Sequence, residues 1–276
     1  MTRTPRAVAL LLALLLGVGA VTACSSDAES GDVDSGAEDG SGNELVGLFR
    51  LTPGAVEGDG ITGTWFRMLQ PGGDADRGPY MKNADSPADG GQATLLAPGT
   101  SGGLRSAGYQ SQPSPAFDAE GDSRADAITV PTRFFGVEFS VSTNRVDPQT
   151  KTEVPPPTVR LEDGELVADL SSWAAAWNNQ DFNQGAPKPV PSTGAQAPGQ
   201  EQAEKVWDWV AQKYLEAAPA ASTTGDLAKG TYDPETKAFT LEWTSYIEGG
   251  PFNGFTGLWH LEGVFEPSGR APDDAG

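Results

Sequence analysis

Hydrophobic and polar residues alternate along several short stretches of this chain, and such a period of two predicts β-strands. We expect strands within residues 43–53, 60–73, 133–143, 158–170 and 241–265. In the second stretch the shared face is expected to hold Ile61, Trp65 and Leu69. In the third it is expected to hold Phe135, Val137, Phe139 and Val141.

Turn residues separate these strands. Asp163-Gly164 lies between two alternating runs and suits a type I′ turn, because Asp and Gly tolerate positive φ. "VDPQTKT" (146–152) and "YDPETKA" (232–238) share Asp-Pro-x-Thr-Lys, which predicts the same turn used twice. "EGGPFNG" (248–254) is interpreted as the bend of a hairpin whose Trp243 and Trp259 face one core. In the alternative, Phe252 and Asn253 contact a partner.

Two segments have apolar residues at helical spacing. The first is "SSWAAAW", with Trp173 and Trp177 on one side and a serine as the N-cap. The second spans 199–219 and follows a proline-rich linker that begins at residue 186, so 186–219 is expected to be an insertion. Trp209 falls on its polar side and is therefore a candidate binding residue.

The composition agrees with many strands and turns, since the chain has 35 glycines and 22 prolines in 276 residues. We expect residues 45–268 to form a mainly β domain, either a β-sandwich or an open barrel, with one or two inserted helices. Residues 269–276 are expected to be a disordered tail.

The first 23 residues have the pattern of an export signal: Arg3 and Arg6 precede an apolar stretch, Ala7 to Ala20. "VTAC" (21–24) then resembles the lipobox of bacterial lipoproteins. That resemblance implies cleavage before Cys24, acylation of Cys24, and anchoring in the lipid bilayer on the extracytoplasmic face of the cell membrane. An ordinary secretory signal with an incidental cysteine is the alternative. Residues 24–44 carry seven acidic residues and no basic ones, which predicts a disordered tether.

The net charge of the whole chain is −20, and without Arg3 and Arg6 it becomes −22. Such a charge disfavours nucleic acid and anionic lipid as partners. It fits cations or cationic partners, although solubility explains it equally well.

Candidate chemistry is sparse. One histidine, His260, and one cysteine make a zinc site or a Ser-His-Asp triad implausible, and we expect a non-enzymatic protein. Paired carboxylates for glycoside hydrolysis stay open. In "FDAEGDSRADAI", Asp118, Glu120, Asp122 and Asp126 occupy positions 1, 3, 5 and 9 of a loop that resembles the calcium loop of EF-hands. Ser123 and Thr129 depart from that pattern, and a solvated acidic loop is the alternative.

Three stretches, "FFGVEFSVSTNRVDPQT", "WNNQDFNQGAPKP" and "TYDPETKAFTLEWTSYIEGGPFNGFTGLWHLEG", resemble uncharacterised exported proteins of high-GC Gram-positive bacteria. This resemblance implies no particular activity. The sequence as a whole predicts a lipoprotein that binds an envelope protein or glycan without catalysis. A carbohydrate-binding or carbohydrate-processing protein is the alternative, and it requires neighbouring tryptophans on an exposed surface.

Overall fold

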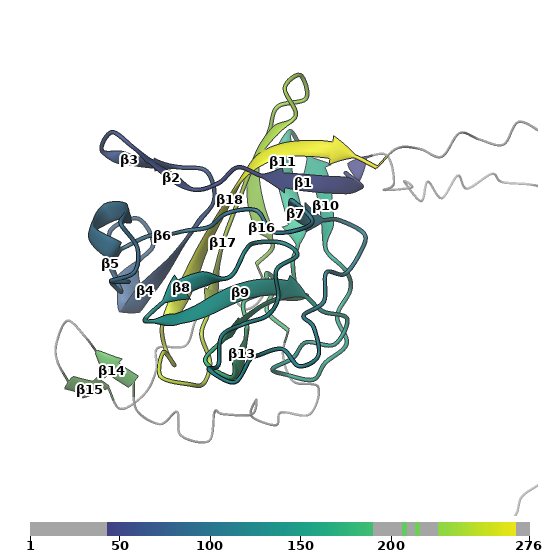
Figure 1. Cartoon of the computed structure of the whole chain (residues 1–276). Coiled ribbons are helices and arrows are strands. Elements are labelled where there is room, and N and C mark those ends of the chain that lie inside the picture. The colour runs from purple at the N-terminus through teal and green to yellow at the C-terminus, as the bar shows by residue number, and fades with distance from the viewer. Residues whose placement is uncertain (1–42, 190–205, 209–212, 216–225, 269–276) are drawn as a thin grey trace, which may run out of the picture. The chain divides into compact units, whose positions relative to one another are not determined.

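The computed structural model describes residues 43–189, 206–208, 213–215 and 226–268 (Figure 1). In these residues the chain is mainly β, as predicted, and its antiparallel sheets do not close into a barrel. The helical element is a short 3₁₀ turn, η2 (Ala88–Gly91). No helix in the described ranges is long and apolar enough to cross a bilayer.

The larger sheet has ten strands in the order β10-β11-β16-β17-β18-β1-β7, with β4 also paired to β18 and with β5 and β6 paired to β4. The seven strands of that order are β10 (Thr158–Glu162), β11 (Glu165–Asp169), β16 (Ala228–Tyr232), β17 (Ala238–Tyr246), β18 (Thr256–Pro267), β1 (Gly47–Leu51) and β7 (Gly103–Arg105). The three strands outside it are β4 (Trp65–Asp74), β5 (Gly78–Tyr80) and β6 (Thr94–Leu95).

Strand β18 organises this sheet because it pairs with three others. Along one edge it pairs with β17, which places Trp259 opposite Trp243. Along its other edge, residues 256–260 pair with β4 and residues 263–267 pair with β1. Buried positions alternate with half-buried or exposed ones along the strand, and Trp259, Leu261 and Phe265 are buried.

A second sheet packs against the first. Its order is β13-β12-β9-β8, formed by β13 (Gln180–Asn183), β12 (Trp173–Trp177), β9 (Val137–Thr143) and β8 (Thr132–Phe134). Figure 1 shows β8 and β9 lying across the face of β17 and β18. Between the layers, the Trp173 ring lies 5.2 Å from that of Trp243 and 5.6 Å from that of Trp259, nearly perpendicular to both. Two antiparallel sheets with one shared core form a β-sandwich.

Two short ribbons complete the described structure. One joins β2 (Ala55–Glu57) to β3 (Gly60–Thr62), and the other joins β14 (Val206–Asp208) to β15 (Lys213–Leu215).

Both predicted hairpins are confirmed. Asp163 and Gly164 have φ values of 51° and 88°, and they connect β10 to β11 as a two-residue turn. In the hairpin of β17 and β18, Trp243 and Trp259 are 5% and 1% exposed, so both face the core as expected.

Both predicted helices are wrong where the structure describes them. Residues 173–177 form the extended strand β12, which pairs with β9 on one side and β13 on the other. Residues 173–176 of that strand are all buried, so both faces are apolar and the period of two is hidden. Within 199–219, residues 206–208 and 213–215 are strands, while Trp209 lies outside the described residues.

Two predicted strand faces also need correction. Phe135 and Gly136 have φ values of 51° and 78°, so they turn the chain between β8 and β9 instead of continuing one strand. Glycine permits this turn, and it leaves Phe135 39% exposed. In β4 the core side is taken by Phe66 and Met68, whereas Trp65 stacks on His260 on the other face of the sheet.

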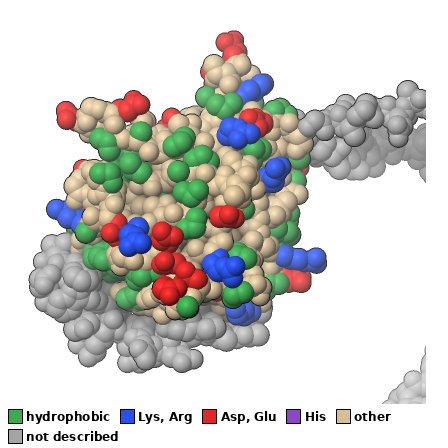
Figure 2. Space-filling model, viewed as in Figure 1, with side chains coloured by type: hydrophobic (Ala, Val, Ile, Leu, Met, Phe, Trp, Pro, Cys, Tyr) green, Lys and Arg blue, Asp and Glu red, His purple; other side chains and the backbone are tan. Residues whose placement is uncertain are grey.

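The surface is mixed in character. On the face seen in Figure 2, acidic and basic side chains lie near one another, and hydrophobic side chains occur in small groups. Over the described residues, the exposed large hydrophobic side chains come from separate segments: Val46, Val56, Val130, Phe135, Val146 and Val264.

Candidate functional site

A polar cleft of about 310 Å³ lies where three separate segments meet. These are the turn 146–152, the hairpin of β12 and β13, and the loop between β17 and β18. The cleft is lined by Pro148, Gln149, Lys151, Asn179, Gln180, Asp181, Phe182, Glu248, Gly249 and Gly250. The three segments are far apart in the sequence, so the fold brings distant residues together at one site.

The loop between β17 and β18 is a glycine-dependent bend, as predicted. Gly249, Gly250 and Gly254 have φ values of 78°, 66° and 90°, which favour glycine. A Cβ atom on Gly250 would lie 2.4 Å from Gln180 Oε1 and 3.1 Å from the Phe182 ring, so the loop approaches β13 closely at this glycine. The bend therefore also forms one rim of the cleft.

The two candidate binding residues of this loop have structural contacts. Asn253 Oδ1 accepts a hydrogen bond from the Gly249 amide at 2.7 Å and so holds the bend. Phe252 is 7% exposed, with ring centroids 5.8 Å from Phe134 and 5.5 Å from Trp177. The Phe252 side chain belongs to the aromatic core beneath the cleft.

A buried side-chain network joins the three rims. Gln149 Nε2 donates to the Glu248 carbonyl at 2.7 Å, and Gln149 Oε1 accepts from the Asn183 amide at 2.8 Å. Asn183 Nδ2 in turn donates to Asp147 Oδ1 at 2.8 Å. Gln149, Asn183 and Asp147 are 4%, 0% and 0% exposed. Buried groups satisfied in this way hold the cleft in one geometry before any ligand arrives.

Lys188 lies beneath the same network. Its Nζ donates to the carbonyls of Asn183 and Tyr246 at 2.9 and 2.6 Å, and it is 3.9 Å from Glu248 Oε2. Burial lowers the pKa of Lys188 to about 8, and this effect outweighs the opposing influence of Glu248 and Asp147. Lys188 therefore has a structural position, with its ammonium turned toward backbone oxygens.

Asp181 supplies the unusual acid of the cleft. Burial raises the pKa of its carboxyl, with a further increase from Asp147, while Gln112 and Lys151 act in the opposite direction. In the described part of the chain, Asp181 Oδ1 is buried and has no hydrogen-bond partner. The Asp181 carboxyl is thus a partly desolvated acid in the wall of the cleft, beside the Lys151 ammonium and the amides of Asn179 and Gln180.

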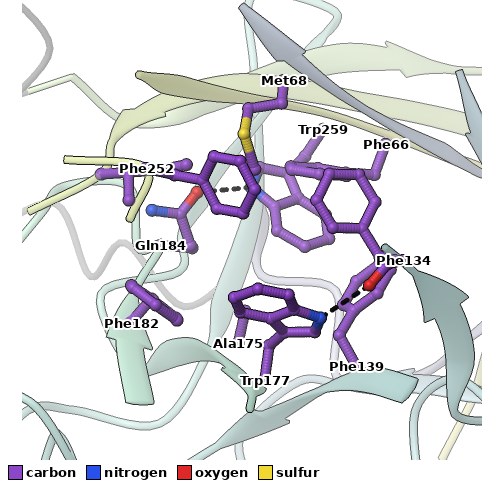
Figure 3. Close-up of a pocket in the computed structure, with 11 residues that line it drawn as sticks. Phe66, Met68, Phe134, Phe139, Ala175, Trp177, Phe182, Gln184, Phe252 and Trp259 are labelled. Carbon is purple, nitrogen blue, oxygen red and sulfur yellow. Dashed lines mark hydrogen bonds between the residues drawn. The ribbon is translucent and has the colours of Figure 1, made fainter. Parts of the chain in front are cut away.

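Behind the cleft lies an apolar cavity of about 40 Å³, shown in Figure 3. Phe182 lines both spaces, so the cavity adjoins the cleft at this residue.

A wider groove of about 630 Å³ runs over the outer face of the large sheet. Arg67 lies there about 5 Å from the ring centroids of Trp65 and Tyr80, and its Nη2 pairs with Asp89 at 3.1 Å. Beside the groove, His260 stacks on Trp65, with Glu242 Oε1 2.6 Å from His260 Nδ1. This hydrogen bond lowers the pKa of Glu242. The groove lacks the interlinked buried network of the cleft.

In the acidic loop 117–128, carboxylate side chains accept hydrogen bonds from backbone amides of the same loop. Asp118 Oδ1 accepts from the amides of Glu120 and Asp122, and Asp122 Oδ1 accepts from the Glu138 amide at 2.8 Å. Asp126 lies beside Thr100, 3.5 Å from its hydroxyl. Across the described ranges, no group of three or more His, Cys, Asp or Glu side chains is placed to hold a metal ion. Calcium binding stays a prediction, and the hydrogen bonds give these carboxylates another role.

Cys24 lies outside the described residues, so the prediction of lipidation is argued from sequence alone. No protein-family model, curated protein or solved structure matches this chain.

Sequence reasoning missed the main residues of the cleft, Gln149, Lys151, Asp181 and Glu248. A signal was present in the repeated turn, because Gln149 stands where Glu235 stands in the second copy. That difference is visible in the sequence, but its importance depends on the burial of one turn and the exposure of the other.

Proposed function

We propose that this protein is a membrane-anchored, extracytoplasmic lipoprotein whose folded domain binds an envelope ligand in the polar cleft, without catalysis. The observation that supports this proposal is the rim network of Asp147, Gln149 and Asn183. It fixes three distant segments around an open space, and binding sites are commonly concave and largely pre-formed.

The lining of the cleft favours a glycan over an apolar protein surface as the ligand. The exposed amide groups of Asn179 and Gln180 offer both donors and acceptors, and Lys151 adds an ammonium group. The hydroxyl groups of a glycan can both accept hydrogen bonds from these donors and donate hydrogen bonds to these acceptors. Neighbouring exposed tryptophans, the other expected mark of a sugar site, do not support it, because the stacked pair Trp243 and Trp259 is buried.

Binding can be tested with a matched pair of variants. Lys151→Ala removes an ammonium from the cleft, whereas Lys237→Ala removes the equivalent lysine from the second, exposed turn. The mature protein would be titrated with solubilised envelope polysaccharide and peptidoglycan fragments. We expect Lys151→Ala and Asp181→Asn to weaken binding at least tenfold with unchanged melting temperatures, and Lys237→Ala to bind normally. Equal binding by all three variants would place the site elsewhere.

The anchor has a separate test. Palmitate labelling of cells expressing the protein should label the natural chain, whereas Cys24→Ala should stay unlabelled and be released or left unprocessed. Continued acylation of the Cys24→Ala chain would disprove the lipoprotein assignment.

A further inference from the structure

The buried side chain of Lys188 reaches two of the three segments that form the cleft. Its Nζ donates to the main-chain carbonyl of Asn183, in β13, at 2.9 Å. It also donates to the carbonyl of Tyr246, at the end of β17, at 2.6 Å. Glu248, in the loop that follows, places its Oε2 3.9 Å from the ammonium. The Lys188 ammonium therefore connects β13 with the loop between β17 and β18.

The third segment acts on Lys188 through charge. Burial disfavours the charged form of Lys188 and lowers its pKa to about 8, while the negative charges of Glu248 and Asp147 act in the opposite direction. Asp147 belongs to the turn 146–152 and is fully buried. On β17, burial and Glu248 raise the pKa of the Tyr246 phenol, so this group stays neutral while Lys188 titrates. Lys188 thus loses its charge near pH 8, in contact with all three segments of the cleft.

The proton on Lys188 matters because of the number of acceptors around it. An ammonium has three donors and a positive charge, whereas the neutral amine has two donors and no charge. The carbonyls of Asn183 and Tyr246 can use both donors of the amine, which leaves neither a donor nor a charge for Glu248. The bonds to the carbonyls also weaken, because charge-assisted hydrogen bonds are roughly twice as strong as neutral ones.

We propose that Lys188 is a positioning residue of the cleft: while it is protonated, its ammonium holds the Glu248 carboxylate and the adjoining loop in place against β13. Loss of the proton releases the carboxylate, which lines the cleft. Gln149 still donates to the Glu248 carbonyl, so the change is local and the loop stays attached. The consequence for binding rests on the proposed function, because a ligand in the cleft would contact this wall. The movement itself needs no ligand.

The isoleucines provide a direct test. The chain has three of them, Ile61, Ile128 and Ile247. Ile247 is the reporter, because it lies between the two residues of β17 and the loop that contact the ammonium. In the ligand-free mature protein labelled with methyl-¹³C isoleucine, the Ile247 resonance should shift between pH 7 and 10 with a midpoint near 8. The Ile61 and Ile128 resonances should show no step with that midpoint.

Two substitutions of Lys188 mimic its two charge states. Lys188→Arg keeps a positive charge at every pH used, so the Ile247 resonance should stay at its low-pH position. Lys188→Met carries no charge, so the resonance should stay at its high-pH position throughout. Lys229→Met, at an exposed position of β16, is the matched control and should titrate as the natural protein does.

Absence of the Ile247 step in the natural protein would overturn the proposal. A step that persists in a folded Lys188→Met variant would overturn it too, as would the same step at all three isoleucines, which would report a change of the whole domain. If Lys188→Arg does not fold, the natural protein and Lys188→Met decide the matter. Since no ligand is present, failure here leaves the proposed binding in the cleft intact, and failure of the binding experiment leaves this result standing.

Discussion

The two Asp-Pro-x-Thr-Lys turns have the same backbone and different surroundings. In both, the lysine amide donates to the aspartate carbonyl, at 2.9 Å for Lys151 and 2.8 Å for Lys237. The two lysines also share a φ near 60°. Yet Asp147 is buried and bonded to Asn183, whereas Asp233 is exposed and its Oδ1 accepts only from its own turn, at Glu235 and Thr236. Local sequence thus sets the turn, and tertiary contacts decide whether the turn contributes to the cleft.

The largest effect should come from removing the first turn's aspartate. Asp147→Ala removes the acceptor of two donors, the side-chain Nδ2 of Asn183 and the backbone N–H of Thr150. We therefore expect it to lower the free energy of unfolding by roughly 4 kcal/mol. Asp233→Ala removes the same local bonds at the surface and should have a much smaller effect. Urea unfolding of both variants measures the difference. Equal losses would show that the turn, and not the buried network, determines the stability.

A pH titration of stability should give the next largest effect, through Lys188, whose Nζ donates to the Asn183 carbonyl beneath the first turn. The folded pKa is about 8 and the ordinary value is 10.5, so between these pH values the unfolded chain holds the extra proton. The free energy of unfolding must then rise with pH, by about 3 kcal/mol in total. We expect this rise in the natural protein relative to Lys188→Met, followed by denaturant unfolding from pH 7 to 10.5. If the difference in the free energy of unfolding between the two proteins stays the same from pH 7 to 10.5, this prediction is contradicted.

The smallest effect concerns the residue that distinguishes the two turns. Gln149→Glu removes the donor to the Glu248 carbonyl and places a carboxylate in a site that is 4% exposed, which should destabilise the fold by about 2 kcal/mol. It should also weaken ligand binding in the cleft. The reciprocal change Glu235→Gln, on the surface, should alter neither the stability nor the binding. If Gln149→Glu changes neither the stability nor the binding, the hydrogen bond from Gln149 to the Glu248 carbonyl is not needed to hold the rim.

Hairpins with a local signal were predictable from the sequence. Asp163-Gly164 specifies its turn by itself, and the alternation around Trp243 and Trp259 follows from one buried face. The strand of Trp173 could not be found in this way, because neighbours cover both of its faces and a short apolar run is ambiguous between strand and helix. The cleft was hidden for a different reason. Gln149 is 34 residues from Asn183 and 99 from Glu248, so only the folded chain shows that they meet.

The pairing of β18 has a consequence for how the chain is made. Synthesis delivers β1 early, yet β1, β4 and β17 all find their partner in β18, roughly 200 residues after β1. The three parts of the large sheet, β10-β11-β16-β17, β1-β7 and β4-β5-β6, therefore cannot be joined until residues 256–267 have emerged, and the pairings of β18 with β1 and β4 have a high contact order. Folding should be slow and should start late, so a chain shortened before β18 would present unpaired edge strands to chaperones and proteases.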